Sequence, residues 1–293
     1  MSGIPVSAHG LVHIYRLEGN DVVALSGVDL DVAAGEVVGL LGPSGSGKST
    51  LLNLFAGLLR PSAGRLTVGS HEIARMDERG LARMRAGDVG VVLQGAMRNL
   101  LPYATPIDNV RFAQRGARKL GRGGDSEMDA GLLPEPDEVL GLVGLGEHAH
   151  TSLTALSPGQ RQRLAVGVGL AARPGLLLLD EPTSQLDHEG RDEVLAAVSD
   201  INRDLGTTVV AVTHDPDVAQ RLPRTVTIRD GRVGAEGRRG EDFAVVARDG
   251  SLTLPPDVLE RVPPGSLLRV TIVDEDAVRL DRTDKPDRDG VAS

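Results

Sequence analysis

The chain reads Gly42-Pro43-Ser44-Gly45-Ser46-Gly47-Lys48-Ser49-Thr50 between an apolar run, Val37–Leu41, and a segment with helical spacing of apolar residues, Lys48–Leu59. The stretch fits the pattern G-x-x-x-x-G-K-[ST] in the strand-then-helix context that this pattern requires. Glycines let the backbone curl so that N–H groups point inward, and the start of the helix adds partial positive charge. A glycine-rich turn before a core helix is the other reading, but the flanking strand and helix favour a site for phosphate groups.

The residue types in this loop point to a nucleoside triphosphate with a divalent cation. Lys48 is predicted to reach the β- and γ-phosphates, and the Ser49 hydroxyl to ligate Mg²⁺. We expect the whole stretch from Gly42 to Thr50 to line the phosphates.

Two adjacent carboxylates follow the apolar run Leu176–Leu179, namely Asp180 and Glu181. The carboxyl end of a buried parallel strand is where ligands bind in an α/β sheet. Successive side chains of a strand point to opposite faces, so the two acids cannot share one role. Asp180 suits the Mg²⁺ shell, and Glu181 suits the orientation or deprotonation of a water at the γ-phosphate. Adjacent Asp and Glu residues are often two solvated acids in a loop. The presence of the phosphate loop is what favours a functional role for this pair.

The remaining pattern predicts an α/β fold. Short apolar runs indicate that residues 4–42 are rich in β-strands, and later strands alternate with helices. Continuous apolar strands indicate a parallel sheet covered on both faces. Residues 115–136 are rich in Gly, Arg and Asp and are expected to form a mobile surface loop or insertion. The pattern G-x-G-x-x-A at Gly167–Ala172 lies inside a predicted helix, so we interpret it as close helix packing rather than a dinucleotide site.

Composition excludes several classes of function. Aromatic residues make up 2% of the chain and the formal net charge is −9, so no nucleic-acid partner is expected. There are no cysteines, which rules out disulfides and thiolate metal sites. No apolar run reaches the roughly 18–20 residues of a membrane span.

A third motif, Leu156-Ser157-Pro158-Gly159-Gln160, lies between the phosphate loop and the two acids. With those motifs, the chain resembles the ABC ATPase family over about 230 residues. The resemblance implies a P-loop fold with an N-terminal antiparallel β subdomain, a parallel-sheet core and a helical subdomain. The resemblance implies ATP as the nucleotide and a dimer in which Ser157, Gly159 and Gln160 face the γ-phosphate bound by the other subunit. The family usually has Gly where this chain has Pro158. Ser157 can act as N-cap with Pro158 at the first helical position, leaving the N–H groups of Gly159 and Gln160 pointing outward.

The resemblance also assigns roles to single residues. It implies that Gln94 senses Mg²⁺ and water, that His214 contacts the γ-phosphate and that Asp187, in Ser184-Gln185-Leu186-Asp187, contacts the opposite subunit. Tyr15 occupies the place of an aromatic residue that stacks on adenine, although lone aromatic residues are mostly core residues. His148 and His150 are too isolated for a metal site and are expected at the surface.

The segment Met76–Val110 resembles the branch of the family that serves lipoprotein release, macrolide export and cell-division permeases. This implies an ATP-hydrolysing subunit on the inner face of the plasma membrane, bound to a permease on a separate chain. Two alternatives remain open: an ATP-gated regulator of a membrane complex that moves no cargo, and a soluble ABC ATPase outside transport. A single cassette without heptad runs disfavours the latter.

We divide the chain into an ATP-binding domain (4–236, with a helical subdomain at about 95–165), a small β-rich appendage (241–283) and a disordered tail (284–293). The appendage is expected to consist of short strands and tight turns. It faintly resembles the swapped-hairpin fold of AbrB-like transition regulators, which bind DNA. Residues 241–293 contain twelve acidic and seven basic residues, the wrong sign for DNA. A dimer-stabilising or regulatory role is preferred.

Overall fold

The computed structural model of the chain describes residues 3–17, 19–120, 133–238 and 241–246. Toward the C-terminus it describes residues 250, 252, 254, 256–263, 266–274 and 277–283. The predicted tail, 284–293, and residues 121–132 of the predicted loop lie outside the described residues.

The N-terminal part is an antiparallel sheet, as predicted. Its strands β1 (Val6–Leu17), β2 (Asn20–Val32), β4 (Ala63–Val68) and β5 (His71–Glu72) have the order β2-β1-β4-β5. Two of the predicted runs, 22–25 and 28–32, belong to the single strand β2. Buried and exposed side chains alternate along much of β1 and at the end of β2, because one face of the sheet covers the core.

The second sheet carries the parallel strands. Its order is β11-β10-β9-β3-β8-β7-β6, and β9, β3, β8, β7 and β6 run parallel. The parallel strands are β6 (Val89–Val92), β3 (Val37–Leu41), β7 (Leu176–Asp180), β8 (Thr208–Val212) and β9 (Arg224–Arg229). The edge strands β10 (Arg232–Arg238) and β11 (Glu241–Ala244) are antiparallel. The main sheet therefore continues into the range that the sequence assigned to the appendage.

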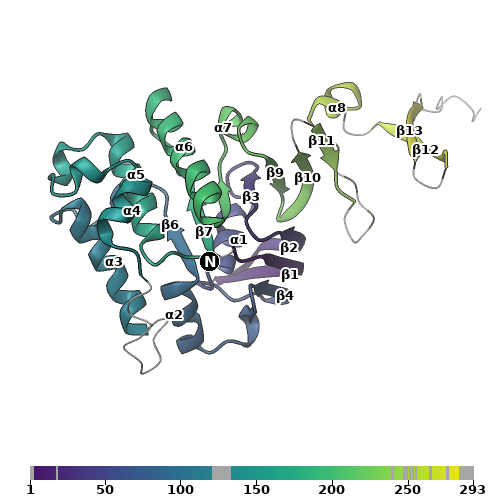
Figure 1. The fold of residues 1–293 in the computed structure, drawn as a ribbon. Coiled ribbons are helices and arrows are strands. Elements are labelled where there is room, and N and C mark those ends of the chain that lie inside the picture. Colours follow the sequence, from purple (N-terminus) through teal and green to yellow (C-terminus); the bar gives the residue numbers. More distant parts are fainter. Residues whose placement is uncertain are drawn as a thin grey trace, which may run out of the picture.

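Two apolar cores lie against the two faces of this sheet. One core joins it to helix α1 (Lys48–Phe55) and the N-terminal sheet, and the other packs it against the helices in teal and green in Figure 1. These helices are α3 (Pro106–Leu120), α4 (Pro136–Leu142), α5 (Pro158–Leu170) and α6 (His188–Leu205). Further helices are α2 (Glu78–Gly87) and α7 (Pro216–Gln220). Residues 115–120, predicted as loop, are the last turns of α3, whose buried Ala117 lies on the face that covers the core.

The G-x-G-x-x-A pattern is a helix contact, as predicted. A Cβ added to Gly167 would lie 3.2 Å from a Val143 side-chain carbon, and one added to Gly169 would lie 2.8 Å from a Val92 side-chain carbon. Glycine here lets α5 approach its neighbours closely.

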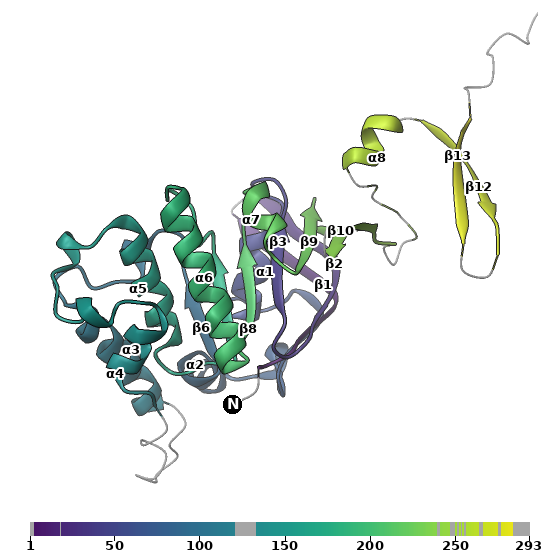
Figure 2. The same cartoon turned by 45° about the horizontal axis from the view of Figure 1, so that its top comes forward.

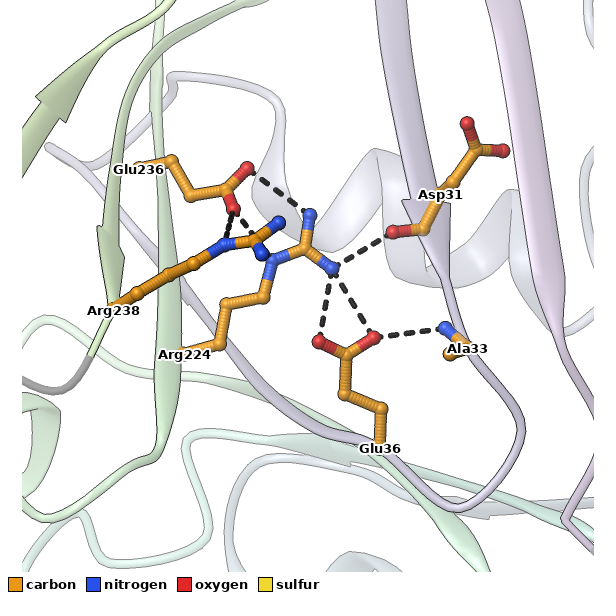
Figure 3. Close-up of polar contacts among 6 residues, drawn as sticks. All are labelled: Asp31, Ala33, Glu36, Arg224, Glu236 and Arg238. Atoms are coloured by element: carbon orange, nitrogen blue, oxygen red, sulfur yellow. Dashed lines mark hydrogen bonds and ion pairs between the residues drawn. The ribbon is translucent and has the colours of Figure 1, made fainter.

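An ion-pair cluster joins the two sheets at the amino ends of β3 and β9 (Figure 3). Arg224 donates to both carboxylate oxygens of Glu236 at 3.0 Å, to Glu36 at 3.1 Å and to the Asp31 carbonyl at 2.8 Å. Arg238 also pairs with Glu236. We call these residues the Arg224 clasp, because Asp31 lies on the N-terminal sheet and Arg224 on the main sheet.

The C-terminal part contains helix α8 (Pro256–Arg261), which was not predicted, and a hairpin of β12 (Leu267–Ile272) and β13 (Val278–Thr283). Figures 1 and 2 both place this hairpin away from the two larger sheets. None of the described residues belongs to a helix with the length and apolar character of a membrane span.

Candidate active site

Four neighbouring parallel strands bring the predicted catalytic residues to one edge of the main sheet. The phosphate loop follows β3, His214 follows β8, Asp180 ends β7 and Gln94 follows β6, and these strands are adjacent in the order β3-β8-β7-β6. Because parallel strands end on the same side, residues far apart in sequence meet there, such as Ser49 and Asp180, which are 131 positions apart.

The phosphate loop needs glycine for steric reasons. A Cβ at Gly42 would lie 2.1 Å from the Ile228 carbonyl oxygen, and one at Gly47 would lie 2.6 Å from the Ala24 carbonyl oxygen. Gly47 also has φ +104°, a conformation that favours glycine. The loop is thus pressed against two other strands, which fixes its curve.

The loop fits an anionic ligand. Lys48 is buried, and its Nζ donates to the carbonyl oxygens of Gly42 (2.8 Å) and Pro43 (2.7 Å). Ser46 Oγ is buried without a hydrogen-bond partner among the described residues. A Cβ at Gly45 would meet no described heavy atom within 4 Å, so this side of the loop is open. Phosphate oxygens would satisfy the unpartnered hydroxyl and the buried cation.

Two charged side chains at this edge, Lys48 and Asp180, are not fully neutralised by the rest of the chain. Burial lowers the pKa of Lys48, and the charges of Glu181 and Asp180 oppose this only in part. Burial likewise raises the pKa of Asp180, as does the charge of Glu181, against the Ser49 hydrogen bond and the charges of Lys48 and Arg98. Each charge therefore lacks full compensation within the chain, which is typical of functional sites.

Ser49 and Asp180 lie together as two ligands of one cation would. Their Oγ and Oδ1 atoms are 3.4 Å apart. Among the described residues there is no group of three or more His, Cys, Asp or Glu side chains that could hold a metal. A hydroxyl and a carboxylate completed by phosphate oxygens suit Mg²⁺, which rarely uses an all-protein cage.

Glu181 is the centre of a polar triad. It accepts from the Gln94 amide nitrogen at 3.1 Å and from His214 Nδ1 at 2.8 Å. Its φ is +47°, strained for a non-glycine residue, and its N–H is held by the Val212 carbonyl at 3.0 Å. The role of Gln94 in sensing Mg²⁺ and water stays a prediction, and in this conformation its amide nitrogen contacts the Glu181 carboxylate.

The segment Ser157–Gln160 begins α5 as predicted, with Pro158 in its first turn. Ser157 Oγ accepts from the Gln160 N–H (3.1 Å), while Gln160 Oε1 accepts from the Ser157 N–H (2.8 Å). The expectation that the Gln160 N–H points outward is wrong, because this N–H donates to Ser157 Oγ within the capping box.

The other predicted residues lie as follows. The Tyr15 hydroxyl is 3.2 Å from Thr50 Oγ1, and its ring meets the His13 ring edge-on at 4.7 Å. Tyr15 is thus next to the phosphate-loop helix, and its stacking on adenine stays a prediction. Asp187 caps α6 by accepting from the Gly190 N–H at 2.9 Å, an intrachain role that the sequence analysis did not assign.

Two residues of this region were missed or misread. His148, expected at the surface, is half-buried, and its Nε2 lies 3.0 Å from the Gln160 amide nitrogen. Because Gln160 Oε1 accepts from Ser157, its Nε2 must donate, so His148 is the acceptor. Arg98 lies close enough to Asp180 to lower its pKa, although its position in sequence carried no motif. Only the fold brings these pairs together.

Comparison with known proteins decides the family. A family profile described as ABC transporter matches residues 25–184. The chain belongs to the ABC transporter ATP-binding family. It is 45% identical over 213 residues to the lipoprotein-releasing system ATP-binding protein LolD of Anaeromyxobacter dehalogenans, covering 73% of this chain and 85% of that protein. It is 39% identical over 226 residues to the methionine import ATP-binding protein MetN 2 of Pseudomonas aeruginosa, covering 77% of this chain and 64% of that protein.

Solved structures agree with the fold. The ABC cassette MJ0796, described as a dimer in a post-hydrolysis state bound to ADP and Pi, gives a TM-score of 0.68 at 31% identity, covering 80% of this chain and 98% of that chain. The predicted resemblance and fold class are confirmed. The chain is an ATP-hydrolysing, ATP-binding subunit of an ABC transporter.

Proposed function

We propose that two copies of this chain enclose two Mg-ATP molecules and thereby drive a separate membrane permease of the export or lipoprotein-release type. Each ATP would lie between the phosphate loop of one copy and the Ser157 segment of the other. The observation that carries this proposal is the Glu181 carboxylate, held between Gln94 and His214 beside the buried Lys48.

Different residues of the chain bind the phosphates, activate the water and would hold the cation. Lys48 and the loop N–H groups bind the phosphates, and the Ser46 hydroxyl gains the partner it lacks. The Glu181 carboxylate orients the attacking water and takes up its proton, with His214 and Gln94 fixing its direction. Bound Mg²⁺, held by Ser49 and Asp180, would neutralise phosphate charge.

Two features support a second copy as the other half of the site. The related cassette MJ0796 is dimeric. The start of α5 offers Ser157 and the Gly159 N–H at a helix N-terminus, where an anionic γ-phosphate is favoured. Asp187 lies at the start of α6, and α5 and α6 approach so closely that a Cβ on Gly159 would be 3.2 Å from Gly190 Cα. The two segments would present one joint surface to the partner copy.

A groove beside the Gln94 loop supports the permease as partner. It has a volume of about 400 Å³ and is lined by residues of α2, β6, α3 and α5 together with the loop residues Leu93 and Asn99. Asn99 holds the Gln94 loop through the Leu93 N–H (2.8 Å), the Leu93 carbonyl (2.9 Å) and the Gly95 carbonyl (3.1 Å). A permease segment seated there would shift Asn99 and, through it, the Gln94 contact with Glu181.

Exposed apolar side chains also occur in the segment that follows Gln94, up to the middle of α3. Met97, Tyr103 and Phe112 are 44%, 85% and 53% exposed. Exposed apolar side chains of this size in one region mark a protein contact. We therefore place the subunit on the cytoplasmic face of a membrane, docked through this surface, with the lipoprotein-release type suggested by relatives named LolD.

Glu181→Gln tests the assignment. We expect ATP hydrolysis to fall by about 10²–10⁴-fold, because a general base is lost. ATP binding should persist, and the variant should accumulate as an ATP-bound dimer in sedimentation velocity. Steady-state hydrolysis at the parental rate would remove Glu181 from the mechanism.

Transport is tested separately from hydrolysis. The subunit would be reconstituted in proteoliposomes with an integral membrane permease that co-purifies with it, and cargo release would be measured against ATP consumption. Cargo movement that stops in Glu181→Gln supports the proposal. ATP hydrolysis without any cargo movement would indicate an ATP-gated regulator instead.

A further inference from the structure

The loop that carries His214 is held by hydrogen bonds on both sides of this residue. Upstream, Thr213 is buried, and its N–H donates to a carbonyl oxygen of β3 at 3.1 Å. Downstream, Asp215 caps α7, and its Oδ1 atom accepts from the Asp217 N–H at 2.9 Å. The His214 side chain is 64% exposed and contacts Glu181. The direction of its imidazole therefore depends on the backbone that these neighbours hold.

An arginine from another helix holds the residue directly after His214. Arg191 of α6 places its Nη1 atom 3.1 Å from Asp215 Oδ2 and 3.4 Å from Asp217 Oδ2. Figures 1 and 2 both show α6 and α7 next to each other. Both oxygens of the Asp215 carboxylate are thus used, Oδ1 by the cap of α7 and Oδ2 by Arg191.

A gain in stability accounts poorly for this ion pair. The Arg191 side chain is 16% exposed, and its Nε atom is buried without a hydrogen-bond partner among the described residues. A cation in such a place loses hydration, and an apolar side chain of similar volume often stabilises a fold equally well or better. A second ion pair, between Arg221 and Asp192, already joins the end of α7 to α6. What Arg191 adds is a fixed position for Asp215.

We propose that Arg191 is a positioning residue for ATP hydrolysis, which acts on His214 through Asp215. With Asp215 held in place, His214 Nδ1 stays 2.8 Å from Glu181 Oε1. The Glu181 carboxylate then keeps its direction toward the attacking water. Hydrolysis is sensitive to small displacements here, because the reacting groups must be held close to the productive geometry.

The same arginine connects His214 to the surface that we assign to the partner copy. The Arg191 N–H donates to the Asp187 carbonyl at 3.0 Å, so Arg191 lies one helical turn after Asp187. Two residues later, Glu193 pairs with Arg163 of α5 at 3.3 Å. The start of α6 is thus tied to α5 and to the His214 loop. This link rests on the proposed sandwich: a partner copy seated on Asp187 would fix α6 and, through Arg191, the His214 loop.

The first test compares two arginines that join the same two helices. For Arg191→Met we expect kcat for ATP hydrolysis to fall by about tenfold and KM to stay within a factor of about two, because the phosphate loop is untouched. Arg191→Lys should recover at least about a third of the parental kcat, since a single nitrogen makes the contact with Asp215.

Arg221→Met is the matched control, because Arg221 joins α7 to α6 through Asp192 and should leave kcat unchanged. Equal losses of kcat in Arg191→Met and Arg221→Met would overturn the proposal. Asp215→Asn removes the Arg191 contact from the other side, since its amide oxygen can still cap α7 while its NH₂ group cannot accept a hydrogen bond. It should reproduce the loss of kcat, and it replaces Arg191→Met in both tests if circular dichroism shows that Arg191→Met does not fold.

The second test asks whether Arg191 acts through His214. If it does, Arg191→Met has no further effect once His214 is alanine, so the double variant and His214→Ala should have rates within about twofold of each other. Single-turnover hydrolysis with excess enzyme measures these low rates. A further tenfold loss in the double variant, by about the same factor as in the single Arg191→Met variant, would show an independent effect and overturn the proposal.

The positioning role and the sandwich can fail separately. ATP-bound dimerisation is measured in the Glu181→Gln chain by sedimentation velocity. If that dimer forms and Arg191→Met hydrolyses ATP at the parental rate, the positioning role is wrong and the sandwich stands. If no dimer forms while Arg191→Met still loses kcat, the sandwich is wrong and the positioning role stands.

Discussion

The two ends of the main sheet each bury a cluster of charged groups, and the clusters differ in how they are balanced. At the amino ends, Arg224 is shared by Glu36 and Glu236, and Arg238 adds a second cation (Figure 3). Burial alone would raise the pKa of Glu236, but the hydrogen bonds and charges of both arginines outweigh it and lower that pKa. The charges of the Arg224 clasp are therefore balanced by one another within the chain.

At the carboxyl ends burial dominates instead. The pKa of Asp180 is raised and that of Lys48 is lowered, so neither charge is fully compensated by the chain. Burial of charge therefore does not by itself mark a functional site. The active edge is distinguished by charges and a hydroxyl, Ser46 Oγ, that still need a ligand.

The largest effect is expected at Lys48, whose charge we assign to ATP hydrolysis rather than to stability. For Lys48→Met we expect hydrolysis to fall by about 10²–10³-fold, because a cation that stabilises developing phosphate charge is lost. The free energy of unfolding should change by less than about 1 kcal/mol, since removing an undercompensated buried charge offsets the lost hydrogen bonds. Steady-state ATPase assays and urea unfolding measure the two quantities; a large loss of stability with preserved ATPase would reverse the assignment.

The opposite result is expected at the clasp. Arg224→Met should lower the free energy of unfolding by about 3 kcal/mol, because Glu36 and Glu236 lose their shared partner. The KM for ATP should remain within a factor of two, since the clasp lies at the other end of the strands. Arg238→Met is the control, because Arg238 is exposed and contacts Glu236 alone among the described acids; it should cost less than about 1 kcal/mol.

Acid should affect the clasp in a defined direction. The folded-state pKa of Glu236 lies below its ordinary value, so the stability it contributes is present above the ordinary carboxyl pKa and is lost as pH falls through the folded pKa. Urea unfolding from pH 7 down to about pH 3 should therefore show a smaller loss of stability in Arg224→Met than in the unaltered chain. Parallel pH curves for the two proteins would show that the clasp does not hold this carboxylate.

The smallest effect is expected at His148, which forms a hydrogen bond with Gln160 of the Ser157 segment. His148→Ala removes the acceptor for Gln160 and should weaken ATP-driven dimerisation of the Glu181→Gln chain by about 3–10-fold, as expected for one hydrogen bond. His148→Gln, which retains an acceptor, should restore much of the affinity. His150→Ala is the neighbouring control, because His150 is exposed. Equal affinities for the His148 and His150 alanine variants would make the His148 contact irrelevant to the dimer.

Short-range patterns in the sequence were sufficient for the fold class and the position of the active edge. The phosphate loop, the buried leucine strand before Asp180 and the capping box at Ser157 are each encoded within a few residues, so their local structure follows from propensity and capping. Errors arose where long-range packing decided the outcome. Residues 115–120 look like a loop by composition, yet they continue α3 because its apolar face packs on the core.

Motifs of fixed spacing identify in the sequence the groups that can do chemistry, namely Lys48, Asp180, Glu181 and the serines of the phosphate loop. Which of these groups touch one another depends on the fold. The Glu181 contacts with Gln94 and His214, the His148 contact with Gln160 and the Arg224 contact with Glu236 each join residues 12 or more positions apart. The order of the parallel strands, set by packing rather than by local propensity, brings such residues together or keeps them apart.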